Sequence, residues 1–270
     1  MDASDPLGDR MKGYERRETD RALLPMLPIC ARIDGRGFSR LTRGMARPYD
    51  QGMVDAMVAT ARHLVAETHA RIGYTQSDEI SLVWLAEGPK SDVFFSGKVQ
   101  KMASVLAGMA TAAFTRAALD GELAPYAVRL PHFDARVWQV PSKAEATNAI
   151  LWREQDATKN AISMAAGAYY SHKQIDGKSG PEKQEMLFRA GVNFNDYPAA
   201  FKRGTFVRRV VFERAFTAAE LERIPEKHRP PAGQMVTRSE VRVLDMPRFG
   251  GVTNREAVIF DGAEPVEATA

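Results

Sequence analysis

The chain has 270 residues, of which 44% are hydrophobic and 26% are charged, values that are typical of folded globular proteins. This balance excludes a collagen, a coiled coil, a small disulfide scaffold and an intrinsically disordered chain. The formal net charge of +3 permits an anionic partner but does not require one.

Cysteine content and hydrophobic patterning bear on the cellular compartment. Cys30 is the single cysteine, so the chain can form neither an intrachain disulfide nor a thiolate zinc site, and we expect a reducing, cytoplasmic location. The charged start of the chain lacks the apolar core of a signal peptide. We expect no apolar stretch of the roughly 18 to 20 residues that span a bilayer, and therefore no membrane partner.

The first half of the chain reads as alternating strands and helices. Residues 1–24 carry many charges without apolar periodicity and are predicted to be a lead-in. Residues 27–33 are an apolar run before a glycine-rich turn, which is typical of a buried strand. Over residues 49–70 apolar side chains recur every three or four positions, which predicts a helix.

A hairpin, a helix and a strand follow. Two β-rich runs, residues 72–76 and 80–85, flank Ser77-Asp78-Glu79, which predicts a hairpin with acids at its tip. A second helix is predicted over residues 99–117, and residues 133–140 alternate with period two before Pro141, which predicts a strand. This order is the split βαβ, ferredoxin-like arrangement, in which an antiparallel sheet carries two helices on one face. Palm domains of many polymerases and cyclases share it.

The second half is predicted to be helical up to about residue 172, then rich in turns, with strands over residues 206–212 and 236–243. We therefore predict an α+β fold, a ferredoxin-like βαββαβ palm with a helical and extended C-terminal portion. Its parts would be a lead-in (1–24), a palm-like catalytic domain (25–141) and a helical and β-rich C-terminal portion (142–270).

Two acid-bearing turns carry the predicted chemistry. Asp34 ends the first strand and Asp78 and Glu79 lie at the hairpin tip, so in a βαββαβ sheet these acids converge. Clustered carboxylates repel each other unless a cation neutralises them, and Mg²⁺ favours a few carboxylates together with substrate oxygens. Two such ions would support in-line displacement of pyrophosphate, as in nucleotidyl transfer. Alternatively, Asp34 begins an Asx turn and the other two acids are solvated turn charges.

The turn after Asp34 has features suited to phosphate. Gly35 and Gly37 allow close approach of the backbone, and Arg36 and Ser39 supply donors beside it, although a lone Gly-x-Gly is a weak signal. Residues 32–39 together with 76–81 resemble the tRNA(His) guanylyltransferase family and its template-dependent relatives, the 3′-to-5′ polymerases. Further blocks that resemble this family, in its order, are residues 47–50, 133–137, 152–156 with Asn160, 191–195, and Pro198 with 202–204. The resemblance covers about residues 20 to 209.

The resemblance implies a homotetrameric enzyme that adds nucleotides to the 5′ end of tRNA, with GTP, ATP and other NTPs as substrates. It implies that two Mg²⁺ ions are held by Asp34, the Gly35 carbonyl and Asp78, and that Glu79 is a further catalytic acid or a solvated turn charge. The residues that would bind the nucleotide come from the glycine-rich turn, the hairpin tip and nearby basic positions: Arg32, Asp34, Gly35, Arg36, Gly37, Phe38, Ser39, Arg47, Ser77, Asp78, Lys98, Lys101, Asn195 and Lys202.

Several of these residues have an alternative interpretation. For Lys98 and Lys101 a solvated helix face is the favoured alternative, and Asn195 suits a turn because Asn tolerates left-handed backbone. The expected tRNA contacts are Asp156, Asn160, Arg203 and Arg208. For the two arginines, a solvated strand edge is the alternative.

Two departures from the family pattern refine the expected function. Thr158-Lys159-Asn160-Ala161 stands where eukaryotic members have His-Ile-Asn-Asn, a block associated with the anticodon, and Ser39 stands where many members have histidine. The sequence is therefore more similar to the bacterial and archaeal members, which repair truncated tRNA 5′ ends. We predict a Mg²⁺-dependent nucleotidyltransferase that extends tRNA in the 3′-to-5′ direction under template control. The alternatives are untemplated guanosine addition to tRNA(His), a palm-type nucleotide cyclase, and a non-catalytic tRNA-binding protein.

Overall fold

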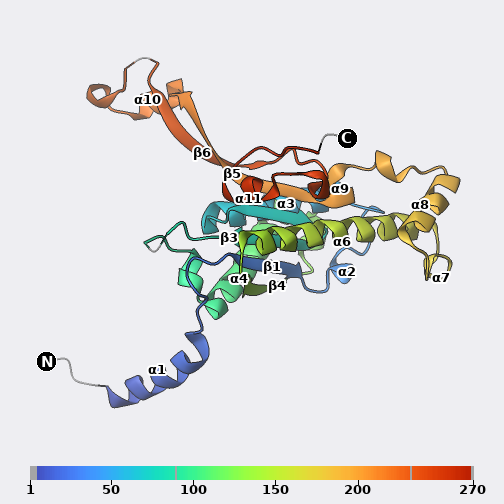
Figure 1. The fold of residues 1–270 in the computed structure, drawn as a ribbon, viewed down its shortest axis with the longest axis horizontal. Coiled ribbons are helices and arrows are strands. Elements are labelled where there is room, and N and C mark those ends of the chain that lie inside the picture. Colours follow the sequence, from blue (N-terminus) through green and yellow to red (C-terminus); the bar gives the residue numbers. More distant parts are fainter. Residues whose placement is uncertain (1–4, 89, 232, 269–270) are drawn as a thin grey trace.

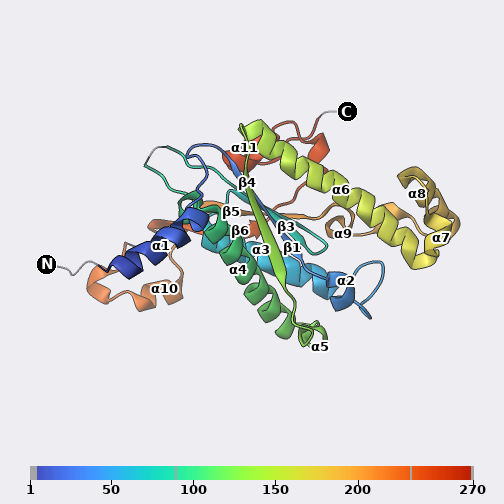
Figure 2. The ribbon, with the colours of Figure 1, turned by 90° about the horizontal axis from the view of Figure 1, so that it is seen from below.

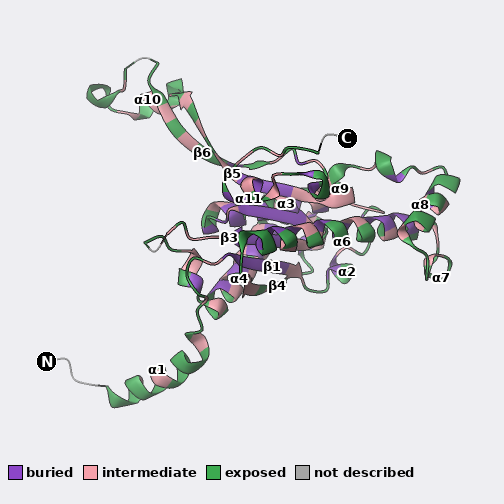
Figure 3. Cartoon of the chain, viewed as in Figure 1, coloured by how far each residue is buried: buried purple, intermediate pink, exposed green. Residues whose placement is uncertain are grey.

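The computed structural model describes residues 5–88, 90–231 and 233–268. Its centre is one antiparallel sheet with the strand order β4-β1-β3-β2-β5-β6 (Figure 1). The strands are β1 (Ile29–Gly35), β2 (Ile72–Gln76), β3 (Glu79–Trp84), β4 (Phe133–Gln139), β5 (Thr205–Ala215) and β6 (Met235–Val243). The far ends of β5 and β6 project from the body as an exposed arm that carries α10 (Figures 1 and 3).

Helices cover both faces of the sheet. Helices α3 and α4 pack on one face, and the first half of α6 packs with α11 on the other (Figure 2). The second half of α6 extends beyond the sheet and packs against α8 and α9 through a third apolar cluster that includes Phe194 and Phe201. The helices are α1 (Pro6–Thr19), α2 (Phe38–Leu41), α3 (Gln51–Thr68), α4 (Val99–Leu119), α5 (Ala124–Ala127), α6 (Lys143–Tyr169), α7 (His172–Ile175), α8 (Gly180–Arg189), α9 (Ala199–Arg203), α10 (Ala218–Arg223) and α11 (Arg255–Phe260).

The predicted mixture of helices and antiparallel strands is confirmed, and the elements from β1 to β4 follow the predicted order. The hairpin differs in one detail. Strand β3 begins at Glu79, which pairs with Gln76, so the turn consists of Ser77 and Asp78 alone. Ser77 adopts a left-handed backbone conformation with φ 53°, which lets two residues close the hairpin. Glu79 therefore lies on the strand and not at the tip.

Helix α4 corrects one expectation from the sequence. By length and composition alone this 21-residue helix could cross a membrane, although a core helix of a folded protein passes the same test. Much of this apolar segment consists of small Ala, Gly and Thr residues. Its full length was therefore not recognised from the sequence. Met102, Leu106 and Phe114 face the sheet and are fully buried, but only 28% of the most apolar 18-residue window is buried.

Arg208 has a structural role that contradicts the predicted tRNA contact. It is 4% exposed, and its guanidinium donates to the carbonyls of Val258 (3.0 Å) and Ala263 (2.8 Å) and pairs with Glu264 (3.2 Å). The residue lies on the face of β5 that α11 covers, next but one to Phe206. It therefore anchors the C-terminal segment to the sheet and is not available to a phosphate backbone.

Replacing Arg208 with methionine is expected to lower the free energy of unfolding by about 3 kcal/mol, because two buried carbonyls lose their donors. Urea unfolding followed by circular dichroism measures this change. The affinity of the folded variant for tRNA should stay within about twofold of the original, since no phosphate contact is lost. Unchanged stability together with weaker tRNA binding would restore the sequence-based interpretation.

Candidate active site

The sheet register brings carboxylates together at one end of β1. Asp34 lies directly opposite Glu79 of β3 and directly opposite Asp134 of β4. Directly opposed residues project to the same face of a sheet, so these three side chains form a row on the side that α6 covers. The Gly35 N–H donates to the Asp78 carbonyl (3.0 Å), which holds the hairpin turn against the end of β1.

Asp78 is the most perturbed acid of this group. Burial raises its pKa to about 6, and the negative charges of Asp34 and Glu79 act in the same direction. Its own N–H and the Ser77 hydroxyl oppose this shift only in part. Two partly buried carboxylates that repel each other are electrostatically costly, and a divalent cation between them would remove that cost.

The donor set fits a cation that also takes substrate oxygens. Within the described residues, no group of three or more His, Cys, Asp or Glu side chains is arranged to hold a metal by itself. Asp34, Asp78 and the carbonyl of Gly35 supply hard oxygen donors from two adjoining turns, which suits Mg²⁺, an ion that commonly keeps water or phosphate ligands. These donors thus suit a metal site in which the protein supplies only some of the ligands and water or substrate supplies the others.

Glu79 is held by arginine. Arg153 of α6 donates to both of its carboxylate oxygens (2.6 and 2.7 Å), and the Nε of Arg32 lies 3.8 Å away. Burial raises the pKa of Glu79, although Arg153 opposes the shift. Arg153 also pairs with Asp156 (3.2 Å) and lies over the exposed ring of Trp152. Arg153 was not predicted as a site residue; its position in the family-like block 152–156 was the available signal.

A cavity of about 700 Å³ opens beside the hairpin turn. Ser39, Arg47, Ser77 and Asp78, four of the predicted nucleotide-binding residues, line it. Phe38 also reaches its edge, but its ring is 3% exposed and packs against two aromatic rings of the core, so most of it belongs to the core.

The opposite wall of the cavity is apolar and was not predicted. Met164 and Ala168 of α6 and Phe201 of α9 line it together with Tyr49. The rings of Tyr49 and Phe201 stack with centroids 5.0 Å apart at 22°. Phe201 is only 5% exposed and belongs mostly to the core, so the surface open to a base comes chiefly from Met164, Ala168 and Tyr49. The hairpin turn with Asp78 gives the cavity a polar end, where a polyphosphate could lie.

The glycine-rich turn has structural reasons for its composition. A Cβ at Gly35 would lie 2.5 Å from the ring of Phe38, so packing alone requires glycine there. Gly37 has φ 68° and precedes α2, a conformation that favours glycine. Arg36 is exposed, and Arg32 is half-buried on the same face as Asp34.

The remaining predicted residues lie around the site or away from it. Lys202 of α9 donates to the Asn195 carbonyl, and this segment also carries Phe201 of the cavity wall. Asp156 and Asn160 lie one turn apart on α6 and share a hydrogen bond (3.3 Å). Arg203 donates to the Met246 carbonyl (3.4 Å).

Lys98 and Lys101 lie at the other end of the sheet. Lys98 pairs with Asp20 (3.4 Å), and the Lys101 ammonium lies 4.7 Å from the centre of the Phe95 ring. The adjacent Phe94 stacks on Trp84, which is opposite the first residue of β1, whereas Asp34 is near the last. Within one chain, the structure does not bring these lysines to the carboxylates, contrary to the expectation that they reach the same site.

Replacing both lysines with alanine is therefore expected to change the KM of a monomeric chain for a nucleotide substrate by less than about twofold, because within one chain these exposed charges lie at the far end of the sheet and are screened by salt. Steady-state kinetics at about 0.15 M salt tests this. A KM raised tenfold or more would show that these lysines reach a bound nucleotide.

The chain is similar to a family of known enzymes. Residues 8–141 match the family model described as tRNA(His) guanylyltransferase. The tRNA(His) guanylyltransferase of Neurospora crassa is 30% identical over 71% of this chain and 70% of its own length, and that of Schizosaccharomyces pombe is 30% identical over 72% and 77%. Two solved structures of bacterial tRNA(His) guanylyltransferase-like proteins superpose with a TM-score of 0.70. The one in complex with ATP is 37% identical and covers 75% of this chain, and the one in complex with GTP is 31% identical and covers 91%; these matches span 88% and 94% of the solved chains.

Proposed function

Because this chain belongs to the tRNA(His) guanylyltransferase family of nucleotidyltransferases, we propose that it extends the 5′ end of tRNA in a Mg²⁺-dependent, template-directed, 3′-to-5′ reaction. The observation that carries the proposal is that Asp78 lines a cavity with an apolar wall and lies close enough to Asp34 for the two charges to interact. Family relatives of similar structure bind ATP and GTP, which supports assigning the cavity to the incoming nucleotide.

The fold supports the same assignment. From the order β4-β1-β3-β2, with α3 and α4 on one face, we propose that these elements form a ferredoxin-like domain that serves as a polymerase-type palm. On this proposal residues 25–141 are the catalytic palm. The portion 142–270 completes the cavity through α6 and α9 and widens the sheet through β5 and β6.

In the proposed mechanism, Asp34, Asp78 and the Gly35 carbonyl would hold Mg²⁺. When bound, the ions would neutralise phosphate charge and stabilise the leaving pyrophosphate. The apolar wall with Met164, Ala168 and Tyr49 orients the base, and Ser77 and Arg47 line the same cavity with groups that can donate to phosphate oxygens.

The reaction forms one phosphorus–oxygen bond and breaks another. The 3′ hydroxyl of the incoming nucleotide attacks the α-phosphorus of a tRNA 5′-triphosphate end, the bond from that phosphorus to the bridging oxygen of the β-phosphate breaks, pyrophosphate leaves, and the hydroxyl proton passes to solvent. Glu79 does not act as a free base on this proposal, because Arg153 occupies both of its oxygens. Its role is to position β3 and α6 on either side of the acidic row.

The proposed substrate is a tRNA with a truncated 5′ end. This proposal rests on residues 158–161. In eukaryotic members the corresponding block contains a histidine and is associated with the anticodon, and this chain lacks that histidine. Untemplated guanosine addition to tRNA(His) remains the second candidate, because the relatives named above carry that activity in their names. The cytoplasmic location and the homotetramer are likewise proposals.

Incubating the protein with Mg²⁺, labelled NTPs and either full-length or 5′-truncated tRNA(His) separates these candidates. We expect incorporation only on the truncated tRNA, and only of the nucleotide complementary to the opposite base. Guanosine added to the intact tRNA irrespective of that base would support the second candidate. Turnover of NTP to a cyclic nucleotide without RNA would contradict both and support a cyclase, and tRNA binding without any turnover would support a non-catalytic protein.

A further inference from the structure

Strand β4 is an open edge of the sheet. It pairs with β1 alone among the described strands, and it runs along the molecule between α4 and α6 (Figure 2). The His132 carbonyl accepts from the Arg36 N–H (2.8 Å) and the Val140 N–H donates to the Pro28 carbonyl (3.1 Å), so even-numbered residues direct their peptide groups toward β1. The peptide groups of the odd-numbered residues 133, 135 and 137 point outward.

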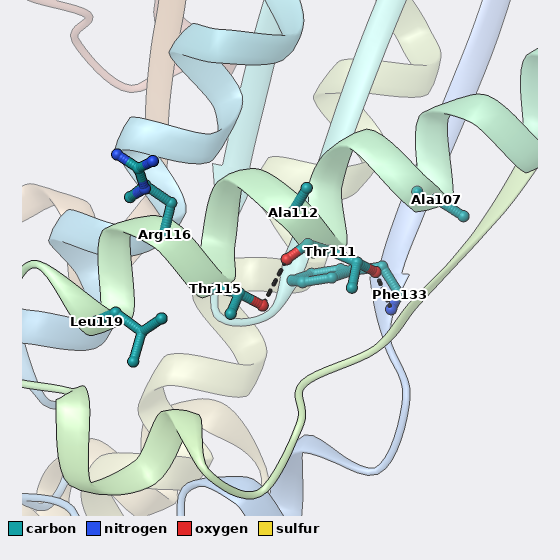
Figure 4. Close-up of a pocket in the computed structure, with 8 residues that line it drawn as sticks. Ala107, Thr111, Ala112, Thr115, Arg116, Leu119 and Phe133 are labelled. Carbon is teal, nitrogen blue, oxygen red and sulfur yellow. Dashed lines mark hydrogen bonds between the residues drawn. The ribbon is translucent and has the colours of Figure 1, made fainter.

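The face of α4 next to this edge is apolar and small. Ala107, Thr111, Ala112 and Thr115 line a shallow hollow of about 580 Å³ together with Phe133, and Arg116 and Leu119 line it nearer the end of the helix (Figure 4). The Thr111 hydroxyl accepts the outward N–H of Phe133 (3.2 Å), which places this helix face directly beside the edge. A largely exposed apolar helix face next to an unpaired strand is unusual for a monomer, because both features favour association.

Charges on the α6 side of the sheet are arranged in rows of one sign. The row at Asp34 continues through Asp134 on the edge, whereas the next row on the same face places Arg32 directly opposite Arg136. Asp134 and Arg136 are both exposed and 3.6 Å apart along the strand. Like charges directly opposite each other are destabilising in a sheet. Each row is therefore stabilised if a strand that pairs with β4 places a residue of opposite charge next to it.

We propose that β4 pairs antiparallel with β4 of a second copy of this chain, about a two-fold axis at Ala135, so that two sheets become one. In this register the outward peptide groups of Ala135 pair with those of its own copy, and Phe133 pairs with Val137. Asp134 then lies opposite Arg136 of the second copy, and the reverse pair forms on the other side of the axis.

The charges select this register over its neighbours. Residues whose peptide groups point away from β1 must pair with the same kind of residue in the second copy. The two-fold axis must therefore lie at a residue of β4, and the neighbouring registers place it one residue earlier or later. An axis at Asp134 would oppose two aspartates, and an axis at Arg136 would oppose two arginines. Each of these registers sets like charges against each other, whereas an axis at Ala135 joins an acidic row to a basic row.

The same symmetry brings the two α4 helices together on the other face of the joined sheet. Apart from Arg116 and Leu119 near the end of the helix, the α4 residues that line this face are Ala, Gly and Thr, which allow interaxial distances near the lower end of the usual range of about 8 to 10 Å. A membrane surface would cover α4 equally well but would leave the outward N–H and C=O groups of β4 unpaired, which is costly in lipid. A second copy satisfies both features.

The pairing also adds to the active site. Arg136 of the second copy would lie beside Asp134, one strand away from Asp34, and would bring a cation to the edge of the acidic row. The pairing itself does not depend on the proposed enzymatic function, so it can be tested by association alone.

Charge reversal tests the pairing in trans. Asp134→Arg and Arg136→Asp each place like charges opposite each other, so each variant alone should dimerise with a Kd raised at least about 30-fold. An equimolar mixture of the two variants should dimerise like the original protein, because every cross-strand pair is again opposite in sign. Sedimentation velocity over a concentration series measures both effects, and thermal melting checks that each variant is folded.

Two further variants keep the test independent of local folding. Ala112→Arg lies on the exposed face of α4 and should prevent dimerisation without lowering the melting temperature. Arg242→Asp is the matched control, since Arg242 and Glu240 have the same spacing on the opposite edge strand β6, and it should dimerise normally. A monomeric original protein at about 100 μM, or a mixture that fails to associate, would overturn the proposal. So would flotation with lipid vesicles that Ala112→Arg abolishes, because α4 would then face a membrane.

Discussion

Replacing Asp34 and Asp78 with asparagine is expected to lower the rate of 5′-end extension by at least about 10³-fold, because both proposed metal ligands lose their charge while keeping their shape. Single-turnover extension of a 5′-truncated tRNA with saturating NTP measures the rate. The affinity for tRNA, measured by filter binding, should change little, since neither carboxylate would attract a phosphate backbone without a metal.

The same substitution has a distinctive effect on stability. Burial and the charge of Asp34 raise the pKa of Asp78, so the ionised carboxylate is unfavourable in the folded protein. Without divalent cations, Asp78→Asn should therefore melt at the same temperature as the original protein or at a higher one. Asp120→Asn, at the exposed end of α4, is the control and should retain full activity. A variant that loses both activity and stability would indicate a structural role instead.

Filling the cavity is the second change with a large expected effect. Ala168 is exposed on α6 and lines the apolar wall, so Ala168→Trp should occupy the space that we assign to the base without disturbing the core. The expected result is a fall in kcat/KM for NTP of at least about 100-fold, equivalent to about 2.7 kcal/mol, with most of the change in KM.

Ala144→Trp provides a matched control for this experiment. Ala144 is exposed in the first turn of the same helix, and it is not among the residues that line the cavity. Its kcat/KM should stay within about twofold of the original, since exposed helix positions away from a site tolerate substitution. Equal losses in the two tryptophan variants would mean that the cavity is not the nucleotide site.

Local patterns were sufficient to predict the strands and the converging acids. Period-two alternation, glycine-rich turns and the order of elements placed Asp34 next to the hairpin, and the register bears out that adjacency. The apolar wall could not be predicted, because Tyr49 is more than 100 residues from both Met164 and Phe201 and meets them only through tertiary packing.

Charged residues were predicted least well, because charge alone does not reveal burial or partners. Arg208 looks like a surface cation in the sequence, yet the C-terminal segment buries it. Glu79 was expected at an exposed tip, but the hairpin closes one residue earlier and Arg153 of a distant helix binds it. Both outcomes depend on chain segments far from the motif itself.

The direction of synthesis is the central claim, and the fate of the γ-phosphate tests it most directly. If the 3′ hydroxyl of the incoming nucleotide attacks the tRNA 5′ end, the nucleotide keeps its own triphosphate, and RNA extended with γ-labelled GTP carries the label at its new 5′ end. We predict one label for each chain extended by a single guanosine, and none with the Asp34→Asn, Asp78→Asn variant. Release of all the label as pyrophosphate, with extended but unlabelled RNA, would contradict the account.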